Sequence, residues 1–311
     1  MLTHYVPLYY LRGFAEQGER EIIWVFDKTT GHSFATQPQK VAAEHDYYPE
    51  EVDQFLANLI EDPCNKMLRR IREELLFSVE DKNEFSQYIL AMIRRVPRHR
   101  ERLYHEVLPD ALEDTVFKWR ATIQSLMDEG RLDSATYSRR MSEIDRIEEE
   151  WKQDLPEEMK PENQPPQISP RVVNSLALMH WTFVIAEGPS KFLTSDNPVF
   201  YTEGIGMGKP ESELMFPLST RLALWVKRIP ISEDCAFHHA RQFLVREANK
   251  RTVHNATRFV MYYEDAEWVR KLTKKRKLKL QLLPPGDHGL YKSRLDRERQ
   301  PHRGGGPSAH Q

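Results

Sequence analysis

Three polar residues stand together at the predicted end of a strand, in the stretch TSDNPVF at residues 194–200. Pro198 holds Asn197 extended, so Ser195, Asp196 and Asn197 would lie where the strand stops. A carboxylate in that place can act as a general base, ligate a metal ion or orient a donor. The spacing alone favours a simpler alternative, an Asx turn in which Asp196 or Asn197 accepts hydrogen bonds from nearby backbone amides.

The opening stretch HYVPLYYLRGF, residues 4–14, offers a second set of reactive side chains. His4 could transfer a proton near neutral pH, and Arg12 could bind a phosphate. Tyr5 lies next to His4 and is a candidate substrate contact. His4 and Arg12 each have an ordinary structural alternative. His4 could be a histidine buried in the core, and Arg12 could be paired with a carboxylate.

Basic residues gather in IRRVPRHRER, residues 93–102, where five arginines and His99 surround Pro97. Such a density at a helix end can contact phosphate, and Arg94 is its candidate substrate contact. A solvated basic corner is the alternative. Further along, NKRTVHNATRFVMYY at 249–263 places Arg258 between a helix and a strand, in the same sheet region as TSDNP.

The chain has 311 residues and a formal net charge of −2, which gives no overall reason to expect nucleic acid or an anionic membrane as a partner. The average hides an asymmetry, because residues 270–303 carry a net +9 and leave the rest near −11. A basic segment of this kind can bind nucleic acid, dock on its own acidic body or stay solvated.

Two cysteines far apart indicate neither a disulfide framework nor a metal site, and no apolar run is long enough to span a membrane. The apolar start lacks a basic leader and is interrupted by Pro7 and Arg12, so it does not resemble a signal peptide. We therefore expect a cytoplasmic protein. The sequence also lacks a Walker loop, an HExxH motif, a GxSxG elbow and paired CxxC motifs.

The order of patterns predicts an α+β fold: an N-terminal β-hairpin, a central helical bundle and a C-terminal, mostly antiparallel sheet with helices. The hairpin is expected at 21–36, the bundle from about 50 to 152, and one amphipathic helix at 237–257. The first hairpin strand could rejoin the C-terminal sheet. The predicted division of the chain is 1–154, a proline-rich linker or loop at 155–170, a sheet part at 171–283 that shares one core with the N-terminus, and a disordered basic tail at 284–311.

Several of these stretches, in this order, resemble one bacterial family, catalogued as domain of unknown function 4238. They are HYVPLYYLRGF, RRVPRHR, FLTSDNPV, FPLS at 216–219 and the N…NATRFV pattern, so the resemblance spans about residues 3–263. The family name supplies no reaction. The resemblance implies that the polar residues of these stretches lie close together in the folded protein. These residues are His4, Arg12, Asp196, Asn197 and Arg258.

Two functions remain open. The first is a nuclease-like hydrolase of a phosphate-bearing substrate, with Asp196 as base or ligand of a divalent metal, His4 as acid–base partner, and arginines that bind negative charge. Its catalytic candidates are His4, Arg12 and Asp196, and its substrate contacts are Tyr5, Arg94, Ser195, Asn197 and Arg258. The second is a non-catalytic binding or regulatory module that contacts nucleic acid, a nucleotide or an acidic partner through 94–102 or 270–303.

Overall fold

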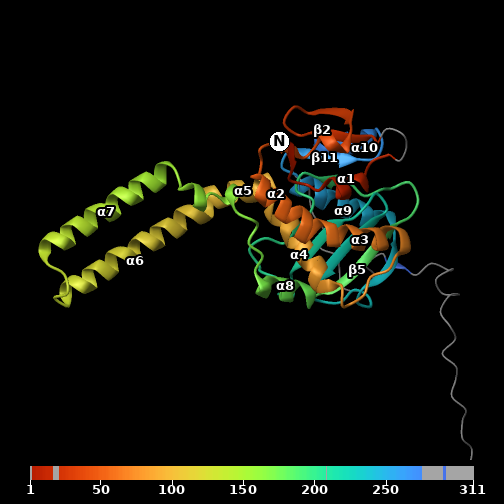
Figure 1. Ribbon diagram of the computed structural model, residues 1–311. Coiled ribbons are helices and arrows are strands. Elements are labelled where there is room, and N and C mark those ends of the chain that lie inside the picture. The colour runs from red at the N-terminus through yellow and green to blue at the C-terminus, as the bar shows by residue number, and fades with distance from the viewer. Residues whose placement is uncertain (1, 17–20, 208, 275–289, 292–311) are drawn as a thin grey trace, which may run out of the picture.

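The computed structural model describes residues 2–16, 21–207, 209–274 and 290–291 (Figure 1). Helices and largely antiparallel sheets form an α+β fold, as the sequence predicts. Most of the basic segment 270–303, and the predicted tail 284–311 apart from 290–291, lie outside the described residues. The predicted division of the chain at 155–170 stays a prediction.

A four-stranded antiparallel sheet joins the two ends of the described chain, in the order β3-β2-β11-β6. Strands β2 (Ile23–Asp27) and β3 (His32–Thr36) form the predicted hairpin, whose turn ends at Gly31 with φ +73°. Strand β11 (Phe259–Tyr262) pairs with β2 on one side and with β6 (Thr194–Ser195) on the other. The hairpin therefore does rejoin the C-terminal strands.

The second sheet has six strands in the order β12-β10-β5-β9-β8-β7, and its one parallel pair is β10 with β5. The strands are β5 (His180–Ala186), β7 (Phe200–Tyr201), β8 (Glu213–Pro217), β9 (Leu222–Lys227), β10 (Ala236–Ala240) and β12 (Leu290–Tyr291). The helix predicted at 237–257 is wrong at its start, because residues 236–240 form β10 and helix α9 spans Gln242–Asn255. All five residues of the stretch AFHHA pair in parallel register with residues 182–186 of β5.

Helical turns follow one another from residue 50 to residue 107, interrupted by π-helical turns, and Phe85 in this run packs against Trp181 of β5. The α-helices are α2 (Glu50–Leu56), α3 (Asp62–Arg69), α4 (Lys82–Arg94) and α5 (Pro97–Arg102), and the π-turns are η2 (Ala57–Glu61), η3 (Arg70–Glu74) and η4 (Leu103–Val107). Pro97 ends the path of α4, because Val96 takes an extended conformation before it. None of the helices in the described ranges is long and apolar enough to cross a membrane.

Helices α6 (Leu108–Asp128) and α7 (Ser134–Gln153) form an antiparallel hairpin that projects away from the rest of the molecule (Figure 1). We call this hairpin the arm. One buried residue from each helix, Val116 and Ile144, marks the thin seam between them. Near its base Trp119 packs edge-on against Trp151, with ring centroids 5.8 Å apart.

The remaining elements connect these parts. They are β1 (Leu2–His4), α1 (Leu8–Arg12), η1 (Pro38–Lys40), β4 (Ala43–His45), η5 (Glu157–Met159), η6 (Pro161–Asn163), α8 (Pro170–Ala177) and α10 (Glu267–Thr273). Short helix α1 packs inside the main core, where the Tyr10 ring stacks on Phe216 at 5.2 Å. Burial of the opening aromatic residues therefore fixes the N-terminal stretch against the C-terminal sheet.

Candidate functional site

Asp196 closes the turn between helix α9 and strand β11. The residue is 2% exposed, and its Oδ1 atom accepts a hydrogen bond from the Thr257 amide at 2.9 Å. Its Oδ2 atom accepts from the amides of Arg258 at 2.6 Å and Phe259 at 2.9 Å. Burial raises the pKa of Asp196, and the three amide donors oppose that rise. The carboxylate thus caps the backbone, with donors that lie more than sixty residues away instead of in an adjacent Asx turn.

Ser195 and Asn197 belong to the same buried network. Asn197 Nδ2 donates to the Asn255 carbonyl at 3.1 Å, and Asn255 Nδ2 donates to the carbonyls of Asn197 at 2.7 Å and Val199 at 2.9 Å. Ser195 Oγ donates to the Asn197 carbonyl at 2.8 Å. These polar groups satisfy one another's hydrogen bonds inside the fold. Their geometry indicates a structural role, in which they connect the end of α9 to the sheet.

The opening stretch does reach this region. The Tyr10 hydroxyl donates to the Pro217 carbonyl at 2.8 Å and lies 2.7 Å from Thr194 Oγ1, two residues before Asp196. Tyr5 is buried, and after burial itself the charge of Asp196 is the largest cause that raises the pKa of Tyr5. Tyr10 of the N-terminal stretch and the strand that precedes Asp196 are therefore neighbours. The convergence of all five polar residues that the family resemblance implies stays a prediction.

The side chains of the other predicted site residues have partners other than Asp196. The Arg12 side chain is 44% exposed and pairs with Glu21 at 3.0 Å. His4 lies beside Arg95, and burial followed by that charge lowers the pKa of His4. Arg258 gives its backbone amide to Asp196, while its guanidinium binds Asp27 Oδ2 at 2.9 Å.

The structure brings five of the predicted site residues together, and these are Tyr5, Ser195, Asp196, Asn197 and Arg258. The printed contacts of His4, Arg12 and Arg94 are with other groups, and the predicted roles of all eight stay predictions. Across the described ranges, no group of three or more His, Cys, Asp or Glu side chains is placed to hold a metal ion. Asp196 therefore belongs to no such group among the described residues, and the divalent metal there stays a prediction.

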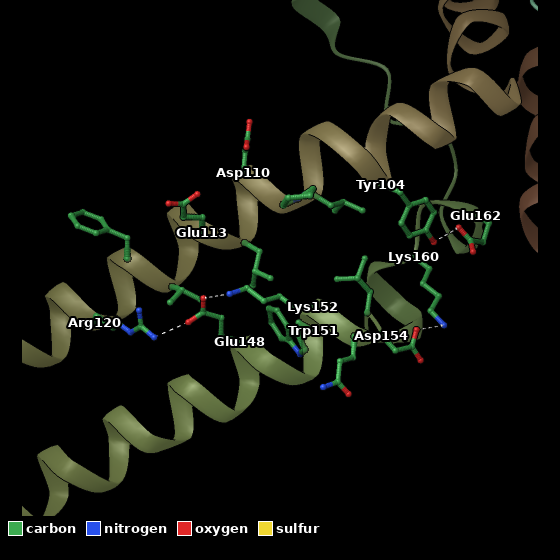
Figure 2. Close-up of a pocket in the computed structure, with 17 residues that line it drawn as sticks. Tyr104, Asp110, Glu113, Arg120, Glu148, Trp151, Lys152, Asp154, Lys160 and Glu162 are labelled. Atoms are coloured by element: carbon green, nitrogen blue, oxygen red, sulfur yellow. Dashed lines mark hydrogen bonds and ion pairs between the residues drawn. The ribbon is translucent and has the colours of Figure 1, made fainter. Parts of the chain in front are cut away.

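A large pocket of about 940 Å³ lies at the base of the arm, between α6 and α7 (Figure 2). Its basic side chains are already paired with acidic ones. Glu148 binds both Arg120 at 2.7 Å and Lys152 at 2.6 Å, and Lys160 binds Asp154 at 3.1 Å. Because the cations are neutralised locally, this pocket offers little net attraction for an anion.

A smaller pocket of about 290 Å³ lies beside helix α5, and we call it the cationic pocket. It is lined by Tyr48, Arg94, His99, Arg100, Leu103, Leu108, Met159, Pro161, Gln164, Pro165, Pro166 and Gln167. None of these residues is acidic. The extended backbone at Val96, followed by Pro97, turns the chain between α4 and α5, so that Arg94 and Arg100 line one pocket.

The five arginines of residues 94–102 divide into two groups. Three have carboxylate partners: Arg95 pairs with Glu61, Arg98 with Glu203 at 3.0 Å, and Arg102 with Glu106 at 3.1 Å. The other two, Arg94 and Arg100, donate to the backbone carbonyls of Gln167 and Tyr47 and form no ion pair with any described residue. The two arginines without a carboxylate partner among the described residues are therefore the two that line the cationic pocket, and the Arg100 guanidinium also lies over the Tyr47 ring at 3.5 Å.

His99 lies between these arginines. Burial, followed by the charges of Arg94 and Arg102, lowers the pKa of His99 to about 4. Its imidazole is consequently neutral at pH 7 and can accept a proton or a hydrogen bond. An anion bound beside it would offset the positive field and raise the pKa of His99.

A comparison with protein families supports the resemblance seen in the sequence. One family model matches residues 3–266, from the opening stretch to beyond strand β11. The chain belongs to this family, described as protein of unknown function DUF4238. The predicted DUF4238 membership is thereby confirmed. No curated protein and no solved structure matches the chain.

Sequence reasoning on this DUF4238 chain identified the basic stretch 94–102, with Arg94 as a candidate contact, but missed the residues that complete the cationic pocket. Most of these lie within residues 159–167, in the stretch predicted as a linker or loop. The only signal there was the run of prolines, which indicates an irregular chain without saying what it covers.

Proposed function

We propose that the chain binds a phosphate-bearing ligand in the cationic pocket. One observation supports this. Arg94 and Arg100, which have no carboxylate partner among the described residues, line the same pocket, and no acidic residue lines that pocket. Arginine presents its donors as a planar fork that matches phosphate oxygens. The function is therefore argued from Arg94 and Arg100 instead of from Asp196.

The energetics of Arg94 favour an anion as the missing partner. The side chain is half-buried, and burial lowers the pKa of Arg94, which means that its charge is poorly solvated where it lies. A desolvated charge is costly unless an opposite charge compensates it. A bound phosphate would supply that charge to Arg94 and Arg100 together.

The surroundings favour a compact ligand over an extended nucleic-acid strand. Outside the cationic pocket, Arg98 and Arg102 are neutralised by Glu203 and Glu106, and paired charges continue into the large pocket. A strand needs a continuous basic track along its backbone. Contact with nucleic acid through residues 270–303 stays a separate prediction, because most of that segment lies outside the described residues.

The hydrolase predicted from the sequence would act on this same ligand class. Within the cationic pocket, His99 is neutral at pH 7 and could accept a proton from an attacking water. Incubating the protein with p-nitrophenyl phosphate, a nucleotide or a short RNA, each with and without Mg²⁺, measures whether binding leads to cleavage. Binding without product supports the non-catalytic alternative.

Removing both unpaired arginines should abolish most of the binding. We expect Arg94→Gln/Arg100→Gln to weaken pyrophosphate binding by at least about 30-fold, since each hydrogen bond to a charged group contributes about 1.5–3 kcal/mol. Isothermal titration calorimetry measures the dissociation constant. The matched control is Arg98→Gln/Arg102→Gln, which removes the same charge from arginines that already have partners.

The control should change the affinity by less than about 3-fold, because exposed ion pairs and distant charges contribute little at physiological salt. Equal losses in the two double variants would show a diffuse electrostatic effect and overturn the proposed pocket. Thermal unfolding of both variants shows whether each remains folded.

Binding of an anion should also depend on pH through His99. Its pKa is about 4 without ligand and higher with an anion bound, so the complex takes up protons as the pH falls below 7. We expect sulfate, whose own charge is constant in this range, to bind about 3-fold more tightly at pH 5.5 than at pH 7. Calorimetry at constant ionic strength measures the change. A His99→Gln variant should lose it, and an unchanged dependence in that variant would exclude His99 as its source.

A further inference from the structure

The cationic pocket has a second wall of a different character. Besides its charged residues, the lining includes Met159, Pro165 and Pro166, together with Leu103 and Leu108. A phosphate alone would leave these apolar groups without a partner, and they would weaken the binding of a ligand that is polar throughout. The lining therefore suits a ligand with one anionic end and one apolar part.

Contacts within residues 157–163 and with η4 hold this wall in place. Tyr104, on the π-turn η4, donates to Glu162 at 2.7 Å, a bond visible at the edge of the large pocket (Figure 2). Glu157 accepts from Lys160 at 2.6 Å, and its carbonyl accepts from Asn163 at 2.9 Å. A wall fixed in this way costs little entropy to order when a ligand binds.

Two side-chain amides lie beside the apolar groups. Gln164 Nε2 donates to the Glu158 carbonyl, and Gln167 Nε2 lies 3.5 Å from Gln164 Oε1. The Oε1 atom of Gln167 and the second N–H of each amide are not used in these contacts. Amides at the rim of an apolar slot can hydrogen-bond the edge of a planar heterocycle, as glutamine does with nucleobases.

We infer that the ligand is a nucleotide, with its phosphate on Arg94 and Arg100 and its base against the wall formed by Met159, Pro165 and Pro166. This inference rests on the proposed phosphate binding and adds the chemical class of the ligand. A pocket of about 290 Å³ is close to the size of a small-ligand site. Flat rings pack well on proline and methionine side chains, whereas an extended nucleic-acid strand would not fit a slot of this size.

The test compares ligands that share a phosphate and differ in the rest. We expect at least one of AMP, GMP, CMP and UMP to bind at least about 10-fold more tightly than ribose 5-phosphate in calorimetry. Met159→Gln should reduce that preference, because Met159 lies on the wall and is 43% exposed. Leu178→Gln, at a 73% exposed position outside the pocket, is the matched control and should leave both the preference and pyrophosphate binding unchanged.

The outcomes separate the two proposals. If all four nucleotides bind no better than ribose 5-phosphate, or if hexyl phosphate binds more tightly than any of them, the nucleotide inference is wrong and phosphate binding stands. If neither pyrophosphate nor any phosphate ester binds, both proposals are wrong. A nucleotide preference that survives Met159→Gln unchanged would also contradict the assigned wall.

Discussion

Replacing Asp196 by alanine is expected to lower the free energy of unfolding by about 3–5 kcal/mol. The change removes the acceptor for three backbone amides, those of Thr257, Arg258 and Phe259, and leaves them in a buried turn. Urea unfolding followed by circular dichroism measures this loss of free energy. In a separate thermal unfolding experiment, the melting temperature should fall by about 10 °C. Glu113→Ala, at an exposed position on α6, should change stability by less than about 0.5 kcal/mol.

The asparagine variant distinguishes a structural from a catalytic role for Asp196. One carboxylate oxygen accepts from one amide and the other oxygen accepts from two. An asparagine side chain at this position would replace one of these acceptors with an NH₂ group, which must then face at least one backbone donor. We therefore expect Asp196→Asn to be destabilised almost as much as the alanine variant. An Asp196→Asn protein with wild-type stability and no activity on a phosphate ester would instead support the catalytic role predicted from the sequence.

Breaking the buried pair of Arg95 and Glu61 should have an effect of similar size. Arg95 is 2% exposed, binds Glu61 with one guanidinium nitrogen and donates to the His4 carbonyl with the other. Arg95→Leu leaves the Glu61 carboxylate mostly buried without its counter-charge, and we expect a loss of about 3–5 kcal/mol. Arg98→Leu, whose partner Glu203 is half exposed, should lose less than about 1 kcal/mol.

A double variant shows how the Arg95–Glu61 pair acts. Arg95→Leu/Glu61→Leu removes both charges, so it should be more stable than Arg95→Leu alone by at least about 1 kcal/mol. The four proteins of this cycle, unfolded in urea at pH 7, give the coupling energy. A double variant whose loss equals the sum of the two single losses would mean that the charges do not interact.

The fold could be predicted where the pattern is local. The hairpin follows from alternating residues around a turn at Gly31, and the helices of residues 50–102 follow from their apolar spacing. Strand β10 could not be predicted in this way. Its residues 236–240 become a strand because β5, some fifty residues earlier, offers a parallel edge, and no periodicity in the segment itself carries that information.

In the candidate site too, features that depend on neighbouring residues could be predicted and features that depend on distant residues could not. The pairing of Arg102 with Glu106 follows an i,i+4 helical spacing that the sequence displays, whereas the pairing of Arg98 with Glu203 joins residues 105 positions apart. Which arginines remain without a carboxylate depends on such distant pairings, so the sequence marked Arg94 as a candidate but could not show that Arg94 and Arg100 are the two without a carboxylate partner. For Asp196 the strand end was predictable and its amide donors were not, since they follow helix α9.

The π-turn η4 sets the relative orientation of two surfaces. Helix α5 presents His99 and Arg100 to the cationic pocket, and after Leu103–Val107 the same helical path continues as α6, which faces α7. A π-turn holds one residue more than an α-helical turn, and each residue of an α-helix advances the direction of its side chains by about 100°. The extra residue therefore rotates the direction of the side chains that follow it. One continuous helical path can then direct the side chains of α5 toward the cationic pocket and those of α6 toward α7.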